Sequence, residues 1–95
     1  MRRFSINKLP ADVLLNTATK VRELRKEAGY SQAELARRSG VSLGSVKRFE
    51  NTGQISMVSF LKILHLLNRL EEFDGILQSG ENLEEIEKLF TNKST

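Results

Sequence analysis

The stretch from residue 31 to residue 51 constrains this chain most, because it predicts two short helices joined by a tight turn. Ser31 can cap the first helix, and Glu34 three positions later completes a capping box. Gly40 lies where the chain must reverse its direction, and only glycine enters the positive-φ region without strain. Ser42 can then cap a second helix. The stretch therefore predicts a helix-turn-helix motif.

The second helix of this pair has one apolar side and one polar side. At about 100° per residue, Val46 and Phe49 lie on the same side as Ser42. The opposite side carries two cations, an amide and a glycine that allows close approach, namely Gly44, Lys47, Arg48 and Asn51. A cationic helix face suits a polyanion such as DNA, although two cations alone are also compatible with an ordinary solvated face.

The motif resembles the DNA-binding domain of the lambda and 434 repressor/Cro superfamily, also called the XRE family. The matching residues are Ser31–Ala36, Gly40–Ser42, Val46 and Phe49–Asn51, and the resemblance extends over about residues 20–78. It implies an all-α fold, a five-helix lambda-repressor-like domain, which in this chain has an extra C-terminal amphipathic helix.

Three regions are expected from the order of these signals. Residues 1–9 form a basic N-terminal arm, residues 10–79 form the helix-turn-helix DNA-binding domain, and residues 80–95 form an acidic C-terminal helix and tail. The first helix begins at Pro10, which is favourable in a first turn, and lasts until Gly29.

Later helices are predicted from apolar spacing. A helix capped by Ser56 is apolar almost all round, so it needs cover on every side, either from the core or from a partner. Residues 68–78 also have helical spacing, although Gly75 weakens it. Residues 82–90 place four apolar residues on one side and acidic residues on the other, with the apolar set being Leu83, Ile86, Leu89 and Phe90.

The resemblance also assigns roles to individual residues. Gln32 matches a glutamine that clamps the DNA backbone, and Arg25 with Glu50 matches a structural ion pair between the first and third helices. Arg48 is the residue best suited to read a guanine, with Lys47 second. The predicted DNA-binding residues are Gln32, Ser42, Leu43, Gly44, Ser45, Lys47, Arg48, Asn51 and Thr52.

The charge distribution agrees with a nucleic-acid partner. Residues 1–50 hold eleven Lys/Arg against five Asp/Glu, a balance of +6, whereas residues 51–95 hold four against seven, a balance of −3. The positive charge therefore lies in the half with the motif. The absence of cysteine excludes disulfides and thiolate zinc sites. No apolar run is long enough for a membrane span, so we expect a cytoplasmic protein that does not bind membranes.

We expect no enzyme activity, no cofactor and no metal site. The single histidine, His65, has apolar neighbours, which favours a role in the core or an interface over catalysis. No phosphate-binding glycine loop, metal-ligand cluster or nucleophile–base pair is present in the sequence pattern.

Three functions are compatible with these patterns. The leading hypothesis is a sequence-specific transcriptional repressor that binds a palindromic site on double-stranded DNA as a homodimer. A second arises because residues 42–50 and 67–74 are similar to HipB-group antitoxins, which implies a HipA-like kinase toxin as partner and repression of the shared operon. A third is a protein-interaction scaffold that has lost DNA binding.

Overall fold

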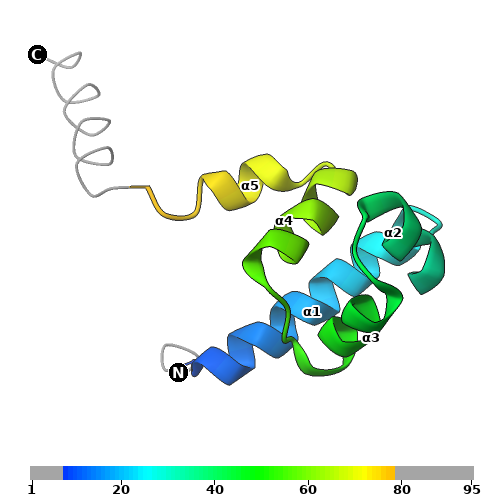
Figure 1. The fold of residues 1–95 in the computed structure, drawn as a ribbon. Coiled ribbons are helices and arrows are strands. Elements are labelled where there is room, and N and C mark those ends of the chain that lie inside the picture. The colour runs from blue at the N-terminus through cyan, green and yellow to red at the C-terminus, as the bar shows by residue number, and fades with distance from the viewer. Residues whose placement is uncertain (1–7, 79–95) are drawn as a thin grey trace, which may run out of the picture.

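The computed structural model describes residues 8–78, and this part of the chain contains five helices. Figure 1 shows α1 running through the molecule, with α2 and α3 packed together near one end and α4 leading to α5 along another side. The helices are α1 (Pro10–Glu27), α2 (Gln32–Ser39), α3 (Leu43–Thr52), α4 (Met57–Leu66) and α5 (Leu70–Asp74). This part of the chain contains no strand, so the predicted all-α fold class is confirmed.

Serine side chains begin three of the helices. In each case the serine hydroxyl accepts a hydrogen bond from the backbone N–H three residues later, at 3.0–3.1 Å. These bonds satisfy N–H groups that the first turn of a helix leaves without partners. The capping serines are Ser31 for α2, Ser42 for α3 and Ser56 for α4.

The capping box expected at the start of α2 is only half formed. Ser31 accepts from the Glu34 N–H, but the Glu34 carboxylate accepts hydrogen bonds from Arg37 and Arg38 one turn further along the helix. Two cations compete with one backbone N–H for that carboxylate, and charged donors form the stronger bonds. The prediction for the Glu34 side chain is therefore wrong.

The core lies between α1, the helix pair and α4. Its four largest fully buried side chains are Leu35 from α2, Val46 and Phe49 from α3, and Ile63 from α4. Ala36 is buried where α2 meets its neighbours, and the small side chain permits a close helix crossing. The apolar side of α3 is thus turned fully inward, so the polar side is left outward.

Gly53 lets the end of α3 approach the backbone of α1. Its φ is +82°, and a Cβ placed there would lie 2.8 Å from backbone atoms of Leu14. Gly40, in the turn between α2 and α3, has a φ of +79° but open space around it. Glycine at position 53 is therefore needed for both conformation and space, whereas at position 40 it is needed for conformation only.

A buried ion pair ties α1 to α3. Arg25 Nε donates to Glu50 Oε2 at 2.6 Å, and the two side chains are only 8% and 5% exposed. Arg25 also donates to the carbonyl oxygen of Tyr30, and Gln32 Nε2 donates to Glu50 Oε1 at 2.9 Å. The pair expected between Arg25 and Glu50 is present, and its remaining hydrogen-bonding capacity is used by the loop before α2 and by α2 itself.

Burial alone would raise the pKa of the Glu50 carboxyl. Hydrogen bonds from Arg25 and Gln32, together with the charge of Arg25, outweigh burial and hold that pKa below its ordinary value. The carboxylate form is therefore favoured by folding, which links the stability of this domain to pH.

Two helices differ from the predictions based on apolar spacing. The helix expected over residues 68–78 is limited to α5, which ends before Gly75, and Ile76 and Leu77 are exposed. The helix α4 is buried along one side only, and Met57 and Val58 are exposed. Among residues 8–78 no element covers that outer side, so the core covers α4 along one side only, and cover by a partner stays a prediction.

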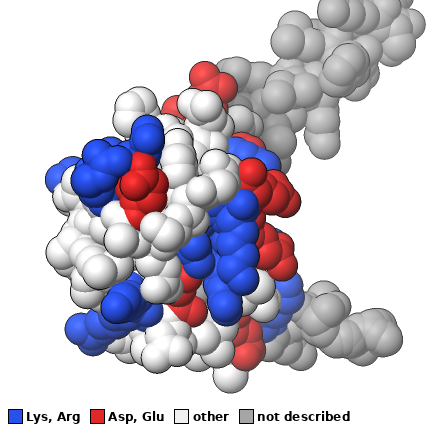
Figure 2. All heavy atoms as spheres, turned by 90° about the vertical axis from the view of Figure 1, so that its right-hand side faces the viewer, with Lys and Arg blue, Asp and Glu red and all other residues white. Residues whose placement is uncertain are grey.

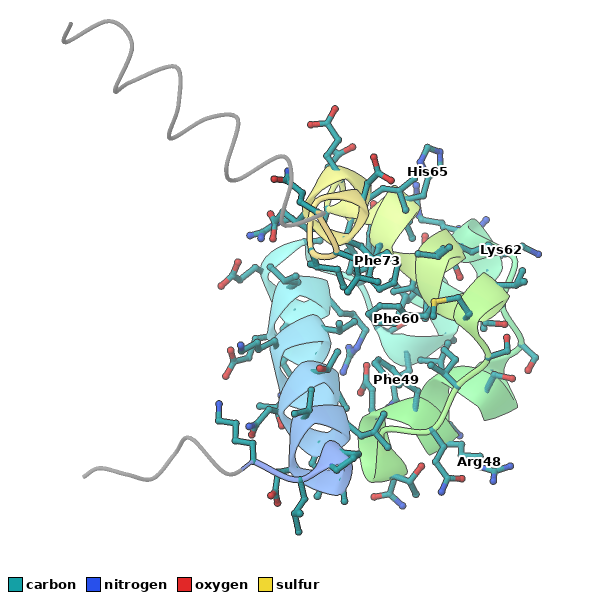
Figure 3. The ribbon with its side chains drawn as sticks, turned by 90° about the vertical axis from the view of Figure 1, so that its left-hand side faces the viewer. Arg48, Phe49, Phe60, Lys62, His65 and Phe73 are labelled. Atoms are coloured by element: carbon teal, nitrogen blue, oxygen red, sulfur yellow. The ribbon has the colours of Figure 1, made fainter. Side chains whose placement is uncertain are left out.

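His65 lies on the exposed side of α4, so of the two expected positions the core is wrong and an interface stays a prediction. Figure 3 shows His65 and Lys62 pointing away from the body of the domain, whereas Phe60 points inward. The expected arm of residues 1–9 is described only at Lys8 and Leu9, both exposed, and the expected acidic helix of residues 80–95 lies outside the described residues.

Substituting Gly53 should destabilise the domain more than substituting a glycine in open space. Gly29 has the same φ of +82°, but a Cβ added there would have no atom within 4 Å. We expect Gly29→Ala to lower the free energy of unfolding by about 1–2 kcal/mol, the cost of a left-handed alanine. Gly53→Ala should cost at least about 1 kcal/mol more, because the overlap with Leu14 is added. Urea unfolding followed by circular dichroism measures both, and equal losses would contradict the close approach.

Acid should weaken the domain through Glu50. Since the folded-state pKa is lowered, this stabilisation is complete above the unfolded value near 4.5 and is lost as the pH falls through the folded value. Glu50→Gln should lower the free energy of unfolding at pH 7 by about 3 kcal/mol, because Arg25 loses its buried counter-charge. It should also flatten the acid-side pH dependence below about pH 5, as measured by urea unfolding. Glu34→Gln, which changes an exposed carboxylate, is the control and should have a much smaller effect at pH 7.

Candidate nucleic-acid interface

The outward side of α3 is polar and accessible. Gly44, Lys47, Arg48 and Asn51 are all exposed, while Val46 and Phe49 on the opposite side are 0% and 2% exposed. The helical spacing therefore places the four residues as expected. Leu43, at the first turn of α3, is also exposed and adds an apolar contact at the end of this surface. An exposed polar side of an α-helix has the form that a major groove of DNA admits.

Arg48 is held by residues at the end of its own helix. Its Nη2 donates to Gln54 Oε1 at 2.6 Å. Thr52 joins the two positions, because its hydroxyl donates to the Arg48 carbonyl at 2.7 Å and accepts from the Gln54 N–H at 3.1 Å. Figure 3 shows Arg48 pointing away from the body of the domain. The guanidinium has five N–H donors, so the bond to Gln54 restricts its position while leaving others for a ligand.

Gln54 is a site residue that the sequence patterns do not identify. The left-handed Gly53 directs the chain back, so that Gln54 meets a side chain six residues earlier. A polar residue directly after the glycine that ends a recognition helix is the available signal. Thr52 is a predicted DNA-binding residue, but its hydroxyl already forms two hydrogen bonds within this network.

Gln32 is partly buried and already has a partner. Its Nε2 donates to Glu50 Oε1, so the amide is oriented by the Arg25–Glu50 pair at the first position of α2. The amide nitrogen carries a second N–H and the amide oxygen can accept, so contact with DNA remains chemically available to this side chain.

Ser42 and Ser45, two predicted DNA-binding residues at the start of α3, form a hydrogen bond between their hydroxyl groups. Ser42 Oγ donates to Ser45 Oγ at 2.8 Å and accepts from the Ser45 N–H. Ser45 also borders an open hollow of about 310 Å³ between α3 and the start of α4, together with Arg48, Gln54 and Ser56. The hollow is polar and lies beside the outward side of α3.

Further cations lie on α2. Arg37 and Arg38 both bond Glu34, and the Arg38 guanidinium carbon lies 5.3 Å from the centre of the Tyr30 ring. The hydrogen bond from Arg38 is the main cause of the lowered pKa of Glu34, and the same bond raises the pKa of Arg38. These arginines are positioned by local contacts.

Figure 2 shows the face of the molecule that lies on the right-hand side of Figure 1, where α2 and α3 are located. Lys and Arg form several groups there, with neutral surface and some acidic side chains between them. Positive charge is therefore distributed over this face, as the charge asymmetry of the sequence predicts, and it does not form one continuous patch.

The described residues hold no other recognisable chemical centre. In residues 8–78 no group of three or more His, Asp or Glu side chains could hold a metal ion. Over the same range, no helix combines the length and apolar character needed to cross a lipid bilayer.

Comparison with known proteins gives one finding. The sequence matches the helix-turn-helix family over residues 21–73, which is more than half of the chain and contains α2, α3 and α4 in full. No curated protein and no solved structure matches the chain significantly. The matched residues lie within the five-helix domain. The chain therefore belongs to the helix-turn-helix family, and its XRE-type domain makes it a DNA-binding transcription regulator.

Proposed function

We propose that this protein is a sequence-specific transcriptional repressor that binds double-stranded DNA with α3 in the major groove. The observation that carries the proposal is the outward side of α3, on which Arg48 is exposed and held by Gln54. We further propose that residues 10–79 act as the DNA-binding domain and that residues 1–9 and 80–95 are separate elements.

Affinity would come mainly from phosphate contacts. Lys47 and the arginines of α2 are exposed cations, and each contact to phosphate would release condensed counterions. Gln32, Asn51 and the first turn of α3 would position the helix on the DNA backbone. Such contacts fix the register of the protein but carry no sequence information.

Specificity would depend on few side chains. Arg48 can form a bidentate contact with guanine, which discriminates by about 1–3 kcal/mol. Leu43 can contact a thymine methyl group, and Gly44 permits close approach of the helix without a hydrogen-bonding side chain. Because direct readout is sparse, the shape and deformability of the DNA would supply part of the selectivity.

Replacing the two cations of α3 should have different effects. Arg48→Ala should lose about 1–3 kcal/mol of preference at one base pair of each half-site. Lys47→Ala should weaken binding to all sequences and reduce the slope of log affinity against log salt by about 1. Gln32→Ala should likewise weaken all sequences without changing the preference. Fluorescence anisotropy with a duplex obtained by binding-site selection, and with a scrambled duplex, measures these effects.

Two further variants test the arrangement around Arg48. Gln54→Ala should reduce the same base preference by less than Arg48→Ala does, because the guanidinium is kept but is no longer restrained. Lys20→Ala, on α1 outside the proposed interface, should leave the preference unchanged. Equal losses of affinity by Arg48→Ala on selected and scrambled DNA would exclude Arg48 as a base-reading residue.

We propose that the repressor acts as a homodimer on a palindromic site. One helix-turn-helix contacts only a few base pairs, and a two-fold pair places two recognition helices about 34 Å apart along the DNA. The exposed side of α4 or the C-terminal segment would supply the contact. Analytical ultracentrifugation at micromolar concentration should give a dimer with the selected DNA, and a strict monomer with and without DNA would exclude this part of the proposal.

An antitoxin of the HipB group is the second candidate. It is favoured by the similarity of residues 42–50 and 67–74, and Val58 and Leu77 are exposed apolar residues outside the DNA-binding side. In this case a HipA-like kinase toxin would be the partner. Co-purification of a kinase-like protein encoded beside this chain distinguishes the antitoxin from a repressor that acts alone.

A further inference from the structure

An apolar groove lies between α1 on one side and α4 with α5 on the other. It consists of two open hollows of about 410 and 460 Å³, and they adjoin because Thr17, Phe60 and Phe73 line both. Figure 3 shows the side of the molecule opposite to that of Figure 2, with Phe49, Phe60 and Phe73 one above another between α1 and α4. The groove thus opens on the face opposite to that of Figure 2, and Gln54, which bonds Arg48, lines one end of it.

Aromatic rings form the floor of this groove. Phe49 and Phe60 pack edge to face with their centres 5.8 Å apart, and Phe60 and Phe73 do so at 5.7 Å. These contacts join α3, α4 and α5 in one ladder of rings and fix the shape of the floor without any ligand. A partner would therefore meet a preformed surface.

The walls of the groove are incompletely buried. Val13 and Leu14 from α1, Met57 from α4 and Ile76 after α5 all line it, and all are exposed by more than 40%. Contiguous exposed apolar surface of this kind is uncommon on an isolated small domain and marks a site of contact. Lys20, Arg69 and Glu72 lie at its edge, and Arg69 Nη1 donates to Glu72 Oε2 at 2.6 Å, so the rim has a net positive charge that comes from Lys20.

The sequence that follows the described residues has the matching character. Its apolar positions Leu83, Ile86 and Phe90 recur at helical spacing, and its other side is acidic, with Glu81, Glu84, Glu85 and Glu87. An amphipathic helix of this composition would place apolar side chains on the aromatic floor and carboxylates beside the cationic rim.

The point at which the chain leaves the described domain favours an intramolecular contact. Ile76 lines the groove, and only four residues separate Gln78 from Leu83. A tether this short gives the segment an effective concentration in the millimolar range at its own groove. Residues 83–90 would span about 11 Å as a helix, whereas the α1 wall from Leu14 to Leu24 spans about 15 Å. The segment is therefore short enough to fit.

We propose that residues 81–90 dock as an amphipathic helix into the groove between α1, α4 and α5 of their own chain. This contact covers the apolar walls and holds the acidic side chains away from the DNA-binding side of α3. It does not depend on the proposed repressor function, since it is argued from the lining of the groove and from no contact with DNA.

The absence of cysteine allows a direct distance measurement in the full chain. Asn16→Cys places a spin label on the exposed outer part of α1, and Lys88→Cys places the second on the polar side of the segment. Double electron–electron resonance should give one narrow distance distribution. A broad distribution would overturn the proposal. So would loss of the signal on dilution with a tenfold excess of unlabelled chain, because the segment would then occupy the groove of a second copy.

Neighbouring residues 76 and 77 provide matched variants. Both are exposed apolar residues after α5, at 59% and 86%, but only Ile76 lines the groove. In the doubly labelled chain, Ile76→Glu should broaden the distance distribution, as should the pair Ile86→Glu and Phe90→Glu, whereas Leu77→Glu should leave it narrow. Circular dichroism checks that each variant remains folded. Equal effects of Ile76→Glu and Leu77→Glu, or no effect of the segment variants, would contradict docking in this groove.

Discussion

The buried pair of Arg25 and Glu50 is the contact on which the orientation of the recognition helix depends. It joins the last turn of α1 to a residue near the end of α3, and it also restrains Gln32 and the carbonyl of Tyr30. Two charges taken out of water need mutual contact and further hydrogen bonds, and both are provided here. We therefore expect the pair to contribute more to the specific placement of α1, α2 and α3 than to net stability.

Packing and electrostatics act on different sides of α3. Val46 and Phe49 hold it through the core, and Gly53 brings its last turn against the backbone of Leu14. With α3 fixed in this way, the short network of Thr52, Gln54 and Arg48 can position a guanidinium from a rigid base. The aromatic ladder that begins at Phe49 continues to the groove on the other side of the domain, so one core supports two surfaces.

Local signals in the sequence are sufficient to locate the motif. Ser31, Ser42 and Gly40 act within four residues of their own positions, so their effects can be read without knowing the fold. The errors have a common physical cause. The positions of His65 and Ile76 and the side chain of Glu34 depend on which neighbours are present, and helical periodicity contains no information about neighbours. The bond between Gln54 and Arg48 cannot be predicted from helical periodicity, because it requires the reversal of the chain at Gly53.

The sequence by itself determined that this chain forms an all-α helix-turn-helix domain with a cationic outer side on its second motif helix. Capping residues, glycine positions and apolar spacing are short-range properties, and they specify helices and their inward sides. Only the tertiary structure decided that α4 is covered on one side, that Gly53 meets Leu14, and that an apolar groove with an aromatic floor lies open between α1, α4 and α5 of the described domain. Those features arise from the distances between helices, which depend on how all the side chains pack at once.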